Sequence, residues 1–159
     1  MDATNSLQAA NSIISRLKKD YPNFKFVESS STSWSAQNST ISYSVKSDNF
    51  LIASLLHELG HAISDHKNYS NDYELLKMES EAWIVAKKLS KKYNFEINND
   101  HIEDCLDTYR DWLHKRSSCP KCATTGLQVD KLTYKCLNCY ANWKVGNSRF
   151  CRAYRKQIK

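Results

Sequence analysis

Five consecutive residues, His57 to His61, form the pattern H-E-x-x-H. Apolar residues recur around them at helical spacing, and side chains at positions i and i+4 of a helix lie on one face. His57 and His61 can therefore bind one zinc ion, while Glu58, beside the first ligand, reaches the water on that zinc. The alternative interpretation is a set of ordinary polar residues on a solvated helix face.

A catalytic zinc site needs a third protein ligand and an open fourth position. The following segment predicts another helix, in which Glu79 shares the apolar face with Ala82. A buried carboxylate is unfavourable unless it is paired or binds a metal, so Glu79 is the favoured third ligand. Glu81, on the other side of this helix, and His66, five residues beyond the motif, are the alternatives.

The chemistry expected of such a site is metal-assisted hydrolysis. Zinc lowers the pKa of its bound water toward ~7, Glu58 takes the proton as general base, and the hydroxide attacks a carbonyl that zinc polarises. The developing oxyanion needs a further donor, for which Tyr43, Tyr109 and His101 are unranked candidates. Tyr43 could also belong to a sheet edge that holds the substrate as an added strand.

Two C-x2-C pairs follow near the C-terminus, thirteen residues apart. Two such pairs present four thiolates, which close a tetrahedral zinc site with no open position. The few apolar residues between the pairs fit a short hairpin, as in a zinc ribbon, and are too few to fold without metal. The sequence therefore predicts a structural zinc held by four cysteines, Cys119, Cys122, Cys136 and Cys139.

Residues 57–62 (HELGHA) and 79–86 (ESEAWIVA) together resemble the gluzincin-type metallopeptidases, and most of all the ImmA/IrrE-like group common in bacteria and phages. The resemblance covers about residues 40 to 92. It implies a small sheet packed on the active-site helix, zinc held by two histidines and Glu79, a glutamate general base, and hydrolysis of peptide bonds. Trp83 replaces the Asn that often follows E-x-x-A, and the family does not characteristically end in a cysteine-rich module.

The SprT and WLM proteases, which cut DNA-bound proteins, are the second resemblance because they often join H-E-x-x-H to a zinc ribbon. Their third ligand is a histidine after the motif, and His66 lies one residue short of the WLM spacing. A third hypothesis, from another class, is a non-catalytic DNA-binding or adaptor protein with two structural zinc ions.

The charges of the chain are unevenly distributed. Residues 115–159 contain 11 lysines and arginines and one acid, whereas residues 1–114 contain 12 basic and 16 acidic residues. A basic end on an acidic body indicates an anionic partner such as DNA or RNA, the alternative being a solvated tail or an arm packed on the ribbon. Interleaved aromatics, including Trp143, suit base stacking. The candidate nucleic-acid ligands are Arg149, Arg152 and Arg155.

The composition is that of a globular protein, with 159 residues, 41% hydrophobic and 25% charged. No apolar run approaches the ~18 residues of a spanning helix, so no membrane partner is expected. The N-terminus carries no basic and apolar leader, which predicts a reducing, cytoplasmic location in which cysteines bind metal rather than form disulfides.

Periodicity predicts the elements that position these residues. A helix is expected over 5–19, then two or three strands to residue 45, and a helix capped by Asp48 to about residue 64. A capping box at Asn71 starts the next helix, and the cleanest helical face lies at 102–113. The expected fold is α+β: a zincin-like domain over 1–116 with about four helices and a small sheet, then a zinc ribbon over 117–159.

Overall fold

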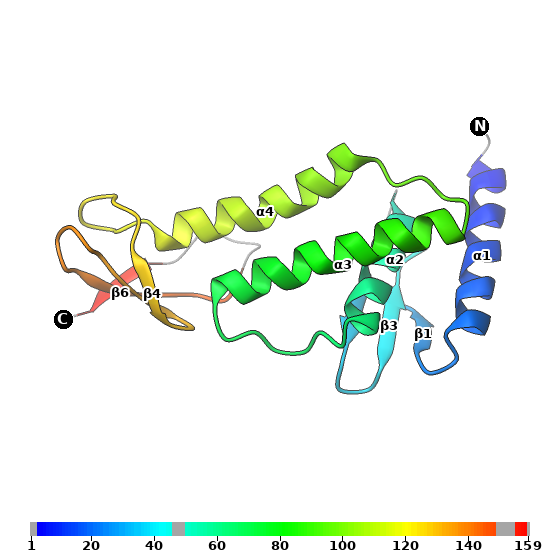
Figure 1. Cartoon of the computed structure of the whole chain (residues 1–159), viewed down its shortest axis with the longest axis horizontal. Helices are drawn as coiled ribbons and strands as arrows, with labels where there is room; N and C mark the ends of the chain where they lie inside the picture. The colour runs from blue at the N-terminus through cyan, green and yellow to red at the C-terminus, as the bar shows by residue number, and fades with distance from the viewer. Residues whose placement is uncertain (1–2, 46–49, 149–154, 159) are drawn as a thin grey trace. The chain divides into compact units, whose positions relative to one another are not determined.

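The computed structural model has the α+β architecture expected, with four helices and two small sheets among its described residues (Figure 1). The described residues are 3–45, 50–148 and 155–158. Contacts divide the chain into a histidine unit, Met1–Lys67 with Met78–Asn98, and a cysteine unit, Asn68–Lys77 with Asn99–Lys159. The predicted boundary after residue 116 separates the fourth helix from the ribbon, whereas the contacts group the two together.

The histidine unit begins with helix α1 and a three-stranded sheet. Its elements are α1 (Ala3–Asp20), β1 (Lys25–Glu28), β2 (Ser33–Ser35) and β3 (Thr40–Tyr43). The strand order is β1-β3-β2, with β3 parallel to β1 and antiparallel to β2. The centre of this sheet is therefore β3, and β2 is an edge strand that contacts the next helix.

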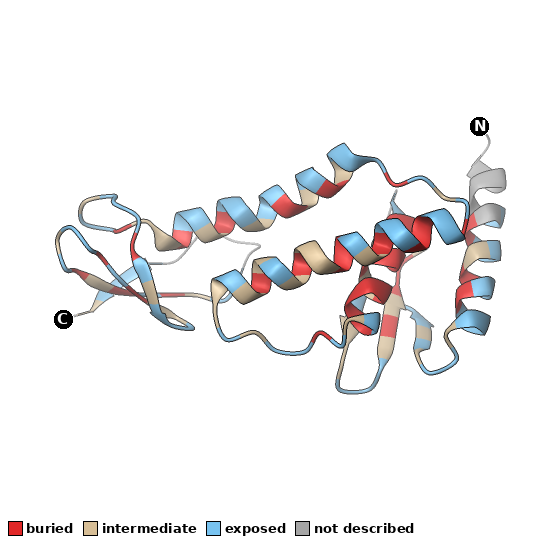
Figure 2. Ribbon diagram, viewed as in Figure 1, coloured by how far each residue is buried: buried red, intermediate tan, exposed pale blue. Residues whose placement is uncertain are grey.

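Helix α2 (Leu51–Ile63) carries the H-E-x-x-H motif, and it is the most deeply buried helix of the chain (Figure 2). Ten of its residues are buried, because apolar side chains occupy nearly its whole circumference. Phe50 occupies the N-cap position without a side-chain cap, while the predicted cap, Asp48, lies outside the described residues. A helix that is buried on most of its surface is stabilised by packing on its neighbours rather than by its ends.

Helix α3 (Asp72–Lys92) starts at the predicted capping box. The Glu74 amide donates to the side-chain oxygen of Asn71 at 2.9 Å. The Glu74 carboxylate returns to the Ser70 amide at 2.7 Å, one residue earlier than the usual reciprocal bond. The first turns of α3 belong to the cysteine unit and the remainder to the histidine unit.

A close contact between α2 and α3 depends on Gly60. A Cβ atom at this position would overlap the carbonyl oxygen of Ala82 and lie 3.0 Å from its carbonyl carbon. Ala82 is fully buried. The two helices therefore touch backbone to backbone at the one glycine of the motif.

The cysteine unit combines helix α4 with a four-stranded antiparallel sheet. Its elements are α4 (Asn99–Ser117), β4 (Leu127–Asp130), β5 (Thr133–Lys135), β6 (Asn142–Val145) and β7 (Arg155–Ile158), in the order β4-β5-β6-β7. The predicted hairpin is β4–β5. The two further strands, β6 and β7, were not expected, since each has only four residues and a mixed polar and apolar sequence.

Arg116 forms the centre of this unit, with only 1% of its surface exposed. Its guanidinium stacks 4.3 Å over the Trp112 ring, lies 3.5 Å from the Asp72 carboxylate and donates to the Lys131 carbonyl oxygen. The indole N–H of Trp143 donates to the Arg116 carbonyl oxygen at 2.9 Å. These contacts join α4, the start of α3 and the sheet into one core.

Candidate metal centres

The first candidate centre begins with two histidines on α2. His57 and His61 are four residues apart, so their rings meet on one helix face with centroids 4.6 Å apart. Their Nε2 atoms lie 3.1 Å from each other. Both side chains are buried, which excludes the alternative of a solvated helix face.

Helix α3 brings Glu79 to the same point. One carboxylate oxygen lies 3.2 Å from the His57 Nε2 atom and 3.6 Å from the His61 Nε2 atom. Glu79 is buried on the apolar face of α3, as its spacing from Ala82 predicted. The structure therefore brings the three favoured ligands together, and these residues could hold a metal ion.

The spacing of the three atoms fits a tetrahedral metal site. Ligand atoms about 2.0–2.1 Å from a zinc ion lie about 3.3–3.4 Å from one another. The distances observed among His57, His61 and Glu79 are 3.1, 3.2 and 3.6 Å. Three ligands at this spacing leave one tetrahedral position for water or substrate.

Two neighbouring glutamates differ in protonation behaviour. Burial alone would raise the pKa of Glu79, but its hydrogen bonds with His57 and His61 outweigh that effect and lower the pKa well below its usual range. Burial raises the pKa of Glu58, opposed by the nearby histidines and by a hydrogen bond with the Trp34 backbone. Glu79 is thus suited to remain an anionic ligand, whereas Glu58 is suited to accept and release a proton.

His66, an alternative third ligand, instead contacts the far nitrogen of His61. The two Nδ1 atoms lie 2.9 Å apart, and the His66 Nε2 atom lies 3.3 Å from a carboxylate oxygen of Glu81. The pKa of His66 is lowered, mainly by burial. His66 and Glu81, the two alternative third ligands, therefore form a hydrogen-bonded chain that starts at the Nδ1 atom of His61. Metal-binding histidines usually have such a partner on the ring nitrogen that does not bind the metal.

A Schellman motif at the end of α2 places His66 there. Asp65 adopts a left-handed conformation with φ of 52°. The amides of Asp65 and His66 then donate to the carbonyl oxygens of Ala62 and His61, at 3.2 and 3.0 Å. In this motif the residue after the left-handed one normally makes an apolar contact with the last turn of the helix. Here that residue is His66, and it contacts His61. The sequence signal for the motif was an Asp, which tolerates positive φ, just past the last apolar residue of the helix.

His57 is held differently from His61. Its ring lies 4.3 Å from the Trp83 ring, centroid to centroid, at an interplanar angle of 32°. Its Nδ1 atom is buried and has no hydrogen-bond partner in the part of the chain that the structure describes. The Trp83 ring therefore restricts the orientation of the His57 ring, which could bind a metal ion.

The oxyanion candidates are dispersed. Tyr43 lies on β3, the central strand, so it cannot belong to a free sheet edge. Its hydroxyl oxygen accepts a hydrogen bond from the Lys18 ammonium group at 3.4 Å. Tyr109 and His101 lie on α4, in the cysteine unit.

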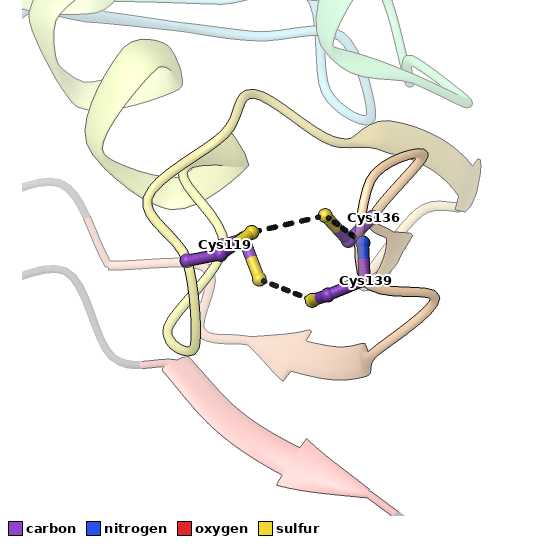
Figure 3. Close-up of side chains that lie close together, drawn as sticks. Cys119, Cys136 and Cys139 are labelled. Atoms are coloured by element: carbon purple, nitrogen blue, oxygen red, sulfur yellow. Dashed lines mark hydrogen bonds between the residues drawn. The ribbon is translucent and has the colours of Figure 1, made fainter.

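The second candidate centre consists of the four cysteines of the C-x2-C pairs, shown in Figure 3. The sulfurs of Cys119 and Cys139 are 3.6 Å apart, and those of Cys122 and Cys136 are 3.5 Å apart. Disulfide sulfurs would lie about 2.0 Å apart, whereas thiolates about 2.3 Å from a tetrahedral zinc lie about 3.8 Å apart. The observed spacing excludes disulfide bonds and is close to that of metal ligands, so the four cysteines could hold a metal ion.

The two cysteine turns have the same local geometry. The residue after each pair, Ala123 or Tyr140, has a positive φ, of 61° and 58° respectively. The Lys121 amide donates to the Cys119 sulfur, and the amides of Asn138 and Cys139 donate to the Cys136 sulfur, all at 3.4 Å. Such bonds favour thiolates. Hydrogen bonding with Thr124 lowers the pKa of Cys122 to about 5, whereas burial and the neighbouring thiols raise the pKa of Cys139 to about 11.

The predicted nucleic-acid ligands are only partly visible. Arg149 and Arg152 lie outside the described residues. Arg155 is exposed on β7, where its guanidinium donates to the Ser118 carbonyl oxygen at 2.8 Å. Trp143 is fully buried and stacks on Tyr134, so the expectation that it stacks on bases is wrong. The Trp143 indole is buried because the inner face of the sheet packs on Arg116.

No helix that the structure describes is both long and apolar enough to cross a membrane. Scans against protein-family models, curated proteins and solved structures found no match for this chain.

Proposed function

We propose that this chain is a zinc-dependent metallopeptidase of the gluzincin type, with a second, structural zinc in a C-terminal ribbon. The observation that carries the proposal is the convergence of His57, His61 and Glu79 at 3.1–3.6 Å, with Glu58 left outside the ligand set. A non-catalytic site would not require a spare, half-buried carboxylate beside the metal.

Zinc bound at this site supplies a Lewis acid that lowers the pKa of water and polarises a carbonyl group. Glu58 accepts the proton of the attacking water and returns it to the leaving amine, a transfer suited to its raised pKa. Glu79 stays ionised and contributes the negative charge of the ligand set. The Nδ1 atom of His66 accepts a hydrogen bond from the Nδ1–H group of His61, and the Nε2–H group of His66 donates a hydrogen bond to Glu81. These two bonds fix the tautomers of both rings.

The position of β2 supports a peptide as substrate. β2 is an edge strand, and the backbone of its central residue, Trp34, hydrogen-bonds Glu58. Trp34 is directly opposite Ile41 of β3 in the antiparallel ladder. An extended peptide added along the open side of β2 would therefore pass beside the general base.

Glu58→Gln is the decisive variant for catalysis. Zinc content and folding stay unchanged because Glu58 is not a ligand, while cleavage of a mixed-sequence peptide library by the zinc-loaded protein is lost. Glu96→Gln, at an exposed glutamate of the same unit, is the matched control and retains activity. Zinc-loaded wild type that cleaves no library peptide, or a Glu58→Gln protein that cleaves equally well, would favour two structural metals instead.

A further inference from the structure

The C-terminal sheet has an inner and an outer face. On the central strands β5 and β6, Tyr134, Trp143 and Val145 point inward and are buried. Tyr134 is directly opposite Trp143 in the ladder, which places both on the same side. Side chains alternate along strands, so the residues between them must lie on the opposite, outer face.

The outer face carries three exposed lysines, one on each of three neighbouring strands: Lys135 on β5, Lys144 on β6 and Lys156 on β7. Lys144 is directly opposite Lys156 across the β6–β7 ladder. On its other side Lys144 faces Thr133, two residues before Lys135. Neighbouring strands are about 4.8 Å apart, so the three ammonium groups can contact one ligand.

This arrangement does not serve the stability of the sheet. Like charges directly opposite each other destabilise an antiparallel pair. Among the described residues, none of the three lysines lies within salt-bridge distance of a carboxylate. One acid, Asp130, is directly opposite Thr133 on this side of the sheet, and its carboxylate accepts a hydrogen bond from the Leu132 amide, so three lysines stand against one carboxylate. The face retains a net positive charge that an external anion would balance.

We propose that this lysine face binds the phosphate backbone of duplex nucleic acid without reading its sequence. Lysine is a flexible point-charge donor, suited to phosphates rather than to base edges. The register places Thr133, Asn142 and Ile158 among the lysines, and Leu127 and Asp130 of β4 beside them, but no aromatic ring, so the face lacks the stacking platform of single-strand binders. A duplex also presents the denser array of phosphates.

The proposal differs from the arginine set expected from the sequence. Arg155 is directly opposite Val145, on the inner side of the sheet, and its guanidinium contacts Ser118. The lysine face is also independent of the proposed peptidase, because its three residues belong to the cysteine unit whereas His57, His61 and Glu79 belong to the histidine unit. Binding is therefore measured without reference to cleavage.

The test compares the zinc-loaded full chain with Lys135→Gln/Lys144→Gln/Lys156→Gln on a 20-base-pair DNA duplex, by fluorescence anisotropy from 50 to 200 mM salt. If the protein contacts three phosphates, the rise in salt over this range weakens binding about 40-fold, because log K falls against log salt with a slope of about −0.9 per contact. We expect the triple variant to bind at least about tenfold more weakly at 50 mM salt, with a slope shallower by about three. Its fold and zinc content are unchanged because all three lysines are exposed.

The matched control is Lys19→Gln/Lys25→Gln/Lys88→Gln, which removes the same charge from exposed lysines of the histidine unit. It retains most of the affinity and the salt slope. The proposal is overturned if wild type does not bind the duplex at 50 mM salt, if both triple variants lose affinity equally, or if neither does. Tighter binding to a single strand of the same length, or to vesicles of anionic lipid, would assign the face to another partner and also overturn it.

Discussion

Gly60→Ala tests whether the close approach of α2 and α3 builds the histidine centre. In an exposed helix this change stabilises by about 1 kcal/mol, because alanine is the better helix former. Here the new methyl group would overlap the carbonyl oxygen of Ala82 and lie 3.1 Å from its Cα atom. Overpacking a tight contact costs about 1–3 kcal/mol. The overlap is with backbone, which cannot rotate away, so the cost should lie in the upper part of this range, at about 2–3 kcal/mol. Less the gain of about 1 kcal/mol in helix propensity, the expected net destabilisation is about 1–2 kcal/mol.

The same substitution should weaken metal binding. Glu79 lies three residues before Ala82 on α3, so a displacement of α3 at Ala82 moves the carboxylate away from His57 and His61. Metal ligand distances are tolerant to only about 0.2 Å. A shift of a few tenths of an ångström should therefore lower zinc affinity about tenfold or more, which corresponds to about 1.4 kcal/mol.

Both effects are measurable after 1,10-phenanthroline has removed the more weakly held metal. Urea unfolding of the histidine unit gives the change in free energy, and competition with a chromophoric chelator gives the zinc affinity. Asn11→Ala, at an exposed position of α1, is the control that reports the ordinary gain in helix propensity. If Gly60→Ala stabilised the protein as the control does and kept its zinc affinity, the tight α2–α3 contact would be refuted as the determinant of the site.

Three further substitutions test the histidine centre, the cysteine centre and the core of the cysteine unit. His66→Phe should lower zinc affinity at the histidine centre about 10–100-fold and alter the absorption of bound cobalt, while His66→Gln, which keeps an acceptor, should retain more of both. Cys119→Ser should reduce metal content from two ions per chain to one by mass spectrometry and melt the cysteine unit, with the histidine centre still loaded. Arg116→Met should destabilise that unit by about 3–5 kcal/mol in thermal unfolding, since it leaves the Asp72 carboxylate without its buried cationic partner, and Asp72→Asn in addition should recover part of the loss.

The histidine centre was largely predictable because its geometry is local. The spacing of His57 and His61 determines a shared helix face whatever the rest of the chain does. Glu79 followed from a second local argument, an acid on the apolar side of a helix, and the structure brings all three together. The cysteine centre was equally accessible, since each pair closes its own turn and only their approach depends on the fold.

The role of His66 could not be predicted from the sequence, because its position depends on how the chain turns after α2 rather than on helix spacing. Periodicity describes side chains only while the helix continues, and His66 lies three residues after Ile63, the last residue of α2. Its position depends on the positive φ of Asp65, which reverses the chain onto His61. The same limit applies to β7, whose pairing with β6 joins segments separated by a polar stretch.

Charge counting was the least reliable guide, because it treats every basic residue as surface. The excess of residues 115–159 includes Arg116, which is 1% exposed and stacks on Trp112. It also includes Arg155, whose guanidinium contacts a backbone carbonyl. The alternation of side chains along the strands determines which basic residues a partner could reach. It places Lys135, Lys144 and Lys156 on the outer face of the sheet and the aromatic rings on the inner face. A basic composition thus indicates an anionic partner, but the sheet register decides which cations can reach it.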